Sequence, residues 1–398
     1  MCPYGRVFLM SILYGQFLQP SASASLEDCA LSFLPSGLSE GKEVKIAEET
    51  SQKIKNMSII CAMLVVTIHV GWPHEELCPT WFIYKFIKGG IAPIAVPFFF
   101  VVSGFFLAAH FNEPGWHFRE IKKRIHSLLI PFFVWSVICF FAIAPLSVIA
   151  DLIAHRPFGT NLQLGDGRWI HSLGLDVDKT PALTPLWYVR CLFFFVLVSP
   201  LFKAIVDRFG KVWLMMTFAI ALIFASIRTP TELLPEGESE PFWSGFFAYG
   251  ISLSGIFYFS LGIYFRKLNN RIGKKSTALL CLIAGAIIVT LNAFLSLNAI
   301  RCPFSLGCIS IPLLMYGTWY FMPSTKWPNW LTSCSFSIFL LHCILLGYCG
   351  IFLKHLHLNA QLASTFSCIG AIIGSILITN LGNRFFPRLT HFLFAGRS

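Results

Sequence analysis

The sequence has few charged residues for its length. Only 12% of its 398 residues are charged and 56% are apolar, whereas roughly a quarter of the residues in a typical soluble domain are charged. A soluble protein of this size needs more polar surface to cover its core, so lipid must cover part of this chain. The scarcity of charge therefore excludes an ordinary soluble fold and indicates an integral membrane protein.

The cysteine pattern lacks the spacing of a metal site or a disulfide framework. The thirteen cysteines include no Cys-x-x-Cys pair, and most of them, Cys343 among them, lie inside apolar segments. We interpret them as small core residues and predict no metal site. Acidic residues are also nearly absent from the middles of the apolar segments, and no inverted repeat is visible. Both absences disfavour the alternative of a transporter or a flippase for lipid-linked glycans.

The net charge of +11 does not indicate a nucleic-acid-binding protein. The basic residues lie in short clusters between apolar stretches, which is typical of loops that face an anionic cytoplasmic leaflet. If the N-terminus is cytoplasmic, 21 of the 30 Lys and Arg residues fall on the cytoplasmic side. An even number of helices then places both termini in the cytoplasm, and we expect a bacterial inner-membrane location.

Ten apolar segments are candidates for transmembrane helices, each of which needs about 20 mostly apolar residues. The sequence therefore predicts an all-α polytopic membrane protein. Its membrane domain is expected at 51–390, with a loosely structured N-terminal extension at 1–50 and a tail at 391–398. Residues 1–24 weakly resemble a signal peptide, but we expect no cleavage. The ten predicted helices are 55–72, 87–110, 127–153, 185–206, 211–228, 246–265, 277–297, 302–321, 330–352 and 362–383.

Two long connections, 154–184 and 229–245, are predicted on the outer side. They carry several acidic residues, and the first also contains Trp169 and His171. One interpretation is that they are solvated connectors. The other is that they form a lid over an extracytoplasmic substrate site.

Histidines inside apolar segments are costly to bury and are candidates for function. His69 ends the first segment, about 20 Å from Lys55 at 1.5 Å per residue. Imidazole titrates near neutrality, so this side chain can accept a proton from an attacking hydroxyl. The alternative is a hydrogen-bonded packing role. His342, in the ninth segment, is a second such histidine, for which the packing role is favoured.

Other polar residues lie at the ends of apolar segments. The second segment contains two prolines that interrupt a helix, and helices of this kind often border a cavity; Ser103 offers a hydroxyl there or serves packing. Trp187 and Arg190 are three residues apart and share a helix face. Arg190 either reaches the interface or points inward near the level of His69.

A basic stretch precedes the third segment. Lys123, Arg124 and His126 lie within four residues of one another. They either contact lipid headgroups or bind a phosphorylated cytosolic ligand.

In this order the motifs resemble the integral-membrane acyltransferase family 3, bacterial enzymes that acylate surface sugars. The resemblance extends over about residues 54–385. The matching stretches are 58–69 ending at His69, Val-Pro-Phe-Phe-Phe-Val-Val-Ser-Gly-Phe (96–105), Arg-Ile-His-Ser-Leu-Leu-Ile-Pro (124–131), Pro-Leu-Trp-Tyr-Val-Arg (185–190) and Ser-Phe-Ser-Ile-Phe-Leu-Leu-His (335–342).

The resemblance implies ten helices, a cytosolic acyl-CoA donor, with acetyl-CoA expected first, and a sugar or glycolipid acceptor. It implies that His69 is the general base and that Arg190 stabilises the oxyanion or orients the acceptor. The expected donor-binding residues are Lys55, Lys123, Arg124 and His126. The expected acceptor-binding residues are Trp187, Ser103 and His342.

The chain departs from the family pattern at two positions. Ser58 and Ser127 stand where the family has arginines that serve the donor. These departures motivate a further alternative, a family member with a non-catalytic role.

Overall fold

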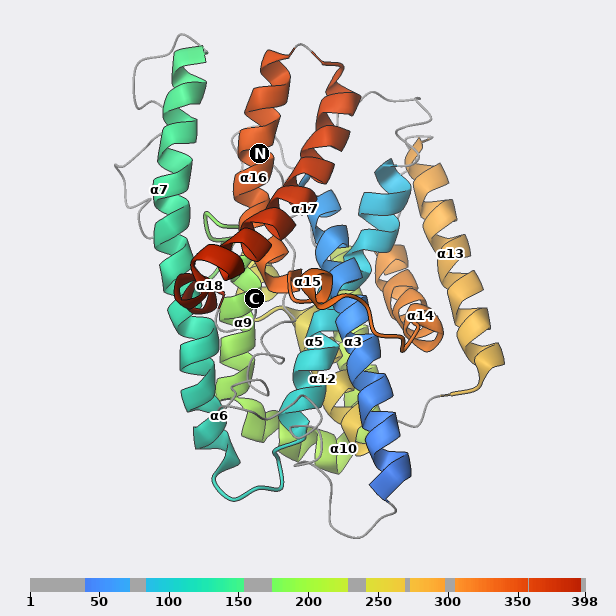
Figure 1. Cartoon of the computed structure of the whole chain (residues 1–398). Coiled ribbons are helices and arrows are strands. Elements are labelled where there is room, and N and C mark those ends of the chain that lie inside the picture. Colours follow the sequence, from blue (N-terminus) through green and yellow to red (C-terminus); the bar gives the residue numbers. More distant parts are fainter. Residues whose placement is uncertain are drawn as a thin grey trace.

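The structure is a computed structural model that describes residues 40–71, 84–153, 174–227, 241–268, 273–297, 305–356 and 358–394. In these ranges every regular element is a helix (Figure 1), which confirms the predicted fold class. Among the described residues, seven helices are long and apolar enough to cross a membrane: Tyr84–Ala108, Trp116–Ala142, Ser199–Ile227, Phe242–Lys267, Lys275–Leu295, Ser335–Leu353 and Ala360–Phe385. The residues 154–173 and 228–240, which hold most of the two outer connections, lie outside the described ranges.

All ten predicted segments contain helix, although three do not meet the requirement for a span. The first lies in α3 (Glu40–His69), the fourth contains α9 (Leu186–Leu197) and the eighth contains α14 (Ser305–Phe321). The 12 residues of α9 are about 18 Å long, which is short for a hydrocarbon core of about 30 Å. The total of ten spans therefore stays a prediction.

The structure has two helix boundaries that the sequence did not predict. α3 begins at Glu40, so residues 40–50 are helical rather than loosely structured. The break predicted near residue 208 is present as a kink at Gly210, and a further break at Val198 separates α9 from α10 (Ser199–Ile227). Pro200 favours a helix start at this point because its fixed φ suits the first turn. α10 then kinks at Gly210, where φ is 43°, a value that glycine adopts without a Cβ penalty.

The second segment is interrupted where its prolines lie. A π-turn, η1 (Ile87–Ile91), leads into a short 3₁₀ turn, η2 (Ala92–Ile94), and then into α5 (Ala95–Ala108). α5 packs very closely against α12 (Leu253–Lys267). Gly104 and Gly262 make this approach possible, since a Cβ on either residue would overlap a backbone carbonyl of the opposite helix.

The core surrounds α3, which packs against η1, η2, α5, α16 (Ser335–His355) and α17 (Ala360–Phe385). The helices α16 and α17 run side by side (Figure 1). The remaining helices are α6 (Trp116–Arg124), η3 (Ile125–Leu129), α7 (Ile130–Ile153), α11 (Phe242–Gly245), η5 (Phe246–Gly250), α13 (Lys275–Leu297), α15 (Asn329–Thr332) and α18 (Pro387–Leu393).

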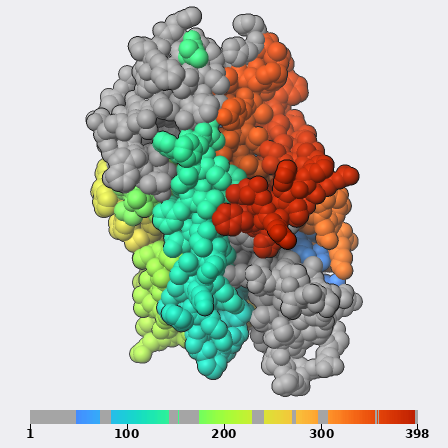
Figure 2. Space-filling model, turned by 60° about the vertical axis from the view of Figure 1, so that its left-hand side comes forward, coloured from blue at the N-terminus to red at the C-terminus, as the bar shows by residue number. Residues whose placement is uncertain are grey.

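The C-terminal helix α18 lies against α7 on the face shown in Figure 2. Trp135 of α7 donates its indole N–H to the Leu393 carbonyl at 2.8 Å and stacks on Phe394, with ring centroids 5.8 Å apart. Residues up to 394 therefore belong to the packed bundle, beyond the predicted domain end at 390.

Candidate active site

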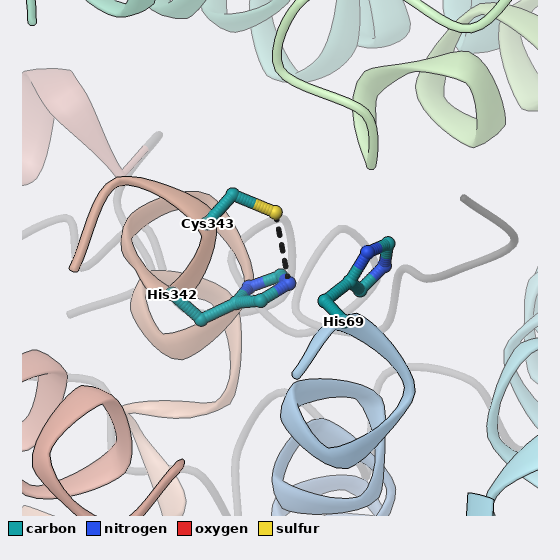
Figure 3. A group of neighbouring side chains, drawn as sticks. All are labelled: His69, His342 and Cys343. Carbon is teal, nitrogen blue, oxygen red and sulfur yellow. Dashed lines mark hydrogen bonds between the residues drawn. The ribbon is translucent and has the colours of Figure 1, made fainter. Parts of the chain in front are cut away.

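Two intramembrane histidines from distant parts of the chain meet inside the bundle. His69 is the last residue of α3 and His342 lies in the second turn of α16. Their ring centroids are 5.1 Å apart at an interplanar angle of 49° (Figure 3). His342 is fully buried, whereas His69 is partly exposed. The sequence singled out both residues, and the structure brings them into one site.

The hydrogen bonds of His342 define its tautomer. Nδ1 lies 2.9 Å from the Ile338 carbonyl, which can only accept, so Nδ1 carries the proton. In the neutral ring Nε2 then carries the lone pair. The Cys343 thiol lies 3.3 Å from this Nε2 and donates to it (Figure 3).

Cys343 is the member of this site that sequence reasoning missed. We interpreted it as a core residue because its spacing to other cysteines matches no motif. The His-Cys dipeptide at 342–343 is the signal that was available. The ligand atoms of His69, His342 and Cys343 all lie within 4.8 Å of one another, and these residue types can hold a zinc or copper ion.

A buried lysine lies beside the histidines. Lys88 of η1 has 9% of its surface exposed and donates from Nζ to the Val70 carbonyl at 3.3 Å. It also interacts electrostatically with His69. A fixed positive charge next to the imidazole can stabilise negative charge that develops during acyl transfer.

Two predicted donor-binding residues converge on one carboxylate. The Glu120 side chain, 2% exposed, accepts from Arg124 at 3.0 Å and from Lys123 at 3.1 Å. Nε2 of His110 lies 3.9 Å from the same carboxylate. Arg124 is buried and Lys123 is half-exposed. The cluster keeps an excess of positive charge on α6.

The other predicted donor residues lie apart from this carboxylate. The ring of His126 donates from Nδ1 to the Lys122 carbonyl at 3.0 Å in an exposed position. Lys55 is half-buried on α3 and has Lys326 as its electrostatic neighbour. Ser58 is buried and donates to the Ile54 carbonyl within its own helix. Ser127 is buried in η3.

Ser103 and Trp187 lie in the neighbouring part of the core. The Ser103 hydroxyl is 3.2 Å from the hydroxyl of Tyr188, and Tyr188 interacts electrostatically with Arg124. This polar connection joins α5, α9 and α6. Trp187 is 1% exposed, and its indole N–H has no hydrogen-bond partner in the described part of the chain.

Arg190 holds a loop together instead of pointing at the histidines. Its guanidinium donates to five backbone carbonyls at 2.6–3.3 Å. These belong to Gly174, Asp176, Val177, Lys179 and Tyr249. The described part of the outer connection is therefore fixed to the start of α9, and this geometry favours a positioning role for Arg190 over oxyanion stabilisation.

Comparison with known proteins identifies a family that covers most of the chain. A family described as "Acyltransferase domain" matches residues 53–380. The succinoglycan biosynthesis protein ExoH of Rhizobium meliloti (strain 1021) is 24% identical over 184 residues, which are 44% of this chain and 48% of that protein. The chain thus aligns with about half the length of this curated relative. No solved structure matches the chain.

Proposed function

The chain belongs to this acyltransferase family of multi-pass membrane proteins, and from that premise we propose that it moves an acyl group from cytosolic acyl-CoA to a sugar hydroxyl. The acceptor is a cell-surface or lipid-linked glycan, and acetyl is the first acyl group to test. A glycan acceptor is supported by the similarity to a succinoglycan biosynthesis protein. The proposed location is the bacterial inner membrane, with both termini in the cytoplasm.

The observation that carries this proposal is the position of His69. It ends α3 in the bundle interior, beside a second histidine and a buried lysine, with part of the residue exposed and its Nε2 buried. In the proposed reaction its imidazole accepts the proton of the acceptor hydroxyl, and the oxygen attacks the thioester carbonyl. The thiolate of CoA leaves and takes up a proton. The product is an ester, and no covalent acyl-enzyme forms.

The donor is proposed to bind near α6. Lys123 and Arg124 carry two positive charges around the single carboxylate of Glu120, so the cluster attracts phosphate groups. Lys55 and His126 are proposed to extend this basic surface. On the acceptor side, the Trp187 indole N–H, Ser103 and His342 are the proposed contacts, and Arg190 acts by fixing the segment 174–179.

The decisive experiment is transfer of labelled acetyl from acetyl-CoA to surface glycan in membranes that contain His69→Ala. We expect a loss of at least about 10²-fold in rate, the usual contribution of a general base. Cys349→Ser, on α16 but outside the site, should keep full activity. Retention of full activity by His69→Ala at matched protein levels would end the proposal.

Ser58 and Ser127 favour a second candidate, a family member that no longer catalyses transfer. Both serines are buried where the family has donor-binding arginines. Under this alternative the purified protein binds no acyl-CoA. A transporter or flippase would move glycan without consuming acyl-CoA. Measuring free CoA release therefore separates acyl transfer from both alternatives, and measuring glycan movement separates the two alternatives from each other.

A further inference from the structure

Three side chains of the types that bind zinc meet at the end of α3. His69 comes from α3, and His342 and Cys343 come from α16 (Figure 3). Their ligand atoms all lie within 4.8 Å of one another. Imidazole nitrogen and thiolate sulfur are preferred by Zn²⁺ and by softer cations, whereas Mg²⁺ and Ca²⁺ prefer oxygen ligands. The chemistry of the set therefore selects a thiophilic ion.

The distances are close to those of a metal site. With Zn–N bonds of about 2.0–2.1 Å and Zn–S bonds of about 2.3 Å, donors of a tetrahedral ion lie about 3.3–3.6 Å apart. The Cys343 sulfur and His342 Nε2 are already 3.3 Å apart. The largest separation in the group, at most 4.8 Å, must shorten by about 1 Å. Because His69 is the last residue of α3, a small rotation of its side chain can supply this movement.

His342 has the orientation of a metal ligand. Its Nδ1–H donates to the Ile338 carbonyl, which leaves the lone pair of Nε2 directed at the cluster. Histidines that bind metals almost always donate their other ring N–H to a carbonyl or carboxylate, which fixes the ring and the tautomer. The required supporting contact is thus already made by the α16 backbone.

The positive charge of Lys88 determines how much negative charge the metal ligands must supply. Its ammonium interacts electrostatically with His69 and repels a divalent cation. Cys343 must therefore bind as a thiolate, which supplies one compensating negative charge, and metal coordination itself favours loss of the thiol proton. Replacing Lys88 by an uncharged side chain should strengthen metal binding.

We propose that His69, His342 and Cys343 bind a thiophilic cation such as Zn²⁺ and that the bound ion stops acyl transfer. The inhibitory part rests on the proposed function, because the ion occupies the His69 lone pair that accepts the acceptor's proton. Three protein ligands leave a fourth position for water. We predicted no metal site from the spacing of cysteines along the chain. Such spacing cannot reveal ligands that two distant helices bring together in space.

Metal binding is tested on the full chain in detergent with Co²⁺ as a spectroscopic probe. We expect tetrahedral Co²⁺ bands and a thiolate-to-Co²⁺ charge-transfer band, both displaced by Zn²⁺. Cys343→Ser should abolish the charge-transfer band, while the matched variant Cys349→Ser on the same helix should keep it. An unchanged band in Cys343→Ser, or no band in the wild-type protein, would overturn the site.

Lys88→Met tests the site by a gain of metal binding, which distinguishes a real effect from the loss of binding that a misfolded variant would show. It should bind Co²⁺ at least about ten-fold more tightly, a gain that corresponds to about 1.4 kcal/mol and that misfolding cannot produce. Weaker or equal binding by Lys88→Met would contradict the electrostatic part of the argument.

Inhibition is tested separately by the transfer assay with and without Zn²⁺. Zinc should inhibit the wild-type protein at a concentration at least ten-fold lower than it inhibits Cys343→Ser. If Co²⁺ binds but Zn²⁺ leaves the rate unchanged or raises it, the inhibitory role is overturned and the metal site stands. If metal-free wild-type protein shows no transfer, the proposed function fails, and the Co²⁺ spectra still decide the site.

Discussion

At the residue scale, Glu120 determines how the basic residues of α6 are arranged. Its carboxylate is almost fully buried between Arg124 and Lys123. Removing one partner of a buried ion pair typically costs about 3–5 kcal/mol, because the other charge remains buried without compensation. We expect Glu120→Gln to lower the free energy of unfolding by about this amount, measured by thermal unfolding in detergent.

Glu113 provides the matched control for this substitution. It also pairs with an arginine, Arg119, but both side chains are about half exposed. Its second contact, to Nδ1 of the buried His110 at 2.9 Å, can be kept by the amide oxygen of glutamine. Exposed pairs contribute only about 0–1 kcal/mol, so Glu113→Gln should change stability by less than about 1 kcal/mol. Equal effects of the two substitutions would show that the Glu120 pair is not buried in the folded protein.

Residue-scale reasoning from the sequence selected side chains that are costly to bury in lipid, and their roles stay predictions. His69 and His342 were both singled out for this reason, and they lie 5.1 Å apart. Cys343 was missed because a cysteine in an apolar segment is ordinarily a core residue. Arg190 was identified as unusual, but its five carbonyl partners come from a loop and from η5. No local pattern predicts which loop a buried arginine holds.

At the element scale, the contact between α5 and α12 depends on two glycines. A Cβ at Gly262 would overlap the Val101 carbonyl, whereas a Cβ at Gly307 in α14 would meet open space. Gly262→Ala should therefore lower the melting temperature, since overpacking costs about 1–3 kcal/mol or more. Gly307→Ala should be neutral or stabilising by up to about 1 kcal/mol, because alanine favours helix. Equal melting temperatures would contradict the close approach of the two helices.

The segment 174–179 is the second element-scale feature, and it depends on Arg190. Arg190→Lys keeps the charge but replaces a planar five-donor group by a single ammonium. Loss of two or more carbonyl bonds, each worth about 1 kcal/mol, should raise amide exchange of 174–179 by at least about ten-fold. The measurement is hydrogen exchange, with the exposed Arg388→Lys on α18 as the control. Unchanged protection of 174–179 would show that Arg190 does not hold it.

Element boundaries were predictable only where the sequence signals them. The prolines of the second segment correctly indicated an interrupted helix. The break between the fourth and fifth segments was predicted correctly, since the chain kinks at Gly210. The earlier break at Val198 was missed, because the apolar pattern continues through Val198 and no charged residue marks the turn there. Pro200 was the available signal. Helix starts such as Glu40 were missed because polar helices outside lipid carry no hydropathy signal.

At the scale of the whole molecule, the exposed surface fits a lipid environment. Large apolar side chains are exposed along the long helices, for example Phe141 on α7, Met215 on α10, Leu280 on α13 and Leu377 on α17. A water-exposed protein does not carry continuous apolar surface of this extent. The number of spans therefore depends on which helices contact lipid over the full thickness of the membrane. With only 12 residues, α9 is too short for this and is buried largely by neighbouring helices.

The distribution of Lys and Arg residues predicts the orientation of the bundle in the membrane. Segments expected on the cytoplasmic side contact one another in the structure: Asp207 pairs with Lys203 and Lys267 at 2.8 Å, and Lys326 lies 3.6 Å from Glu48. Basic segments stay on the cytoplasmic side during insertion. We therefore expect a green fluorescent protein fused at the C-terminus to fluoresce, and alkaline phosphatase fused there to be inactive.

Fusions within the acidic connection 229–245 should give the opposite pattern, with active phosphatase and no fluorescence. This arrangement is what the proposed chemistry requires. Lys55 would then face cytosolic acyl-CoA, and His69, about 20 Å further along the same helix, would lie near an acceptor on the outer side. Active phosphatase at both positions would mean an even number of spans between them, which would contradict a cytoplasmic C-terminus. Inactive phosphatase within 229–245 would reverse α3, and the donor and acceptor faces would then need reassignment, because Lys55 would no longer face the cytoplasm.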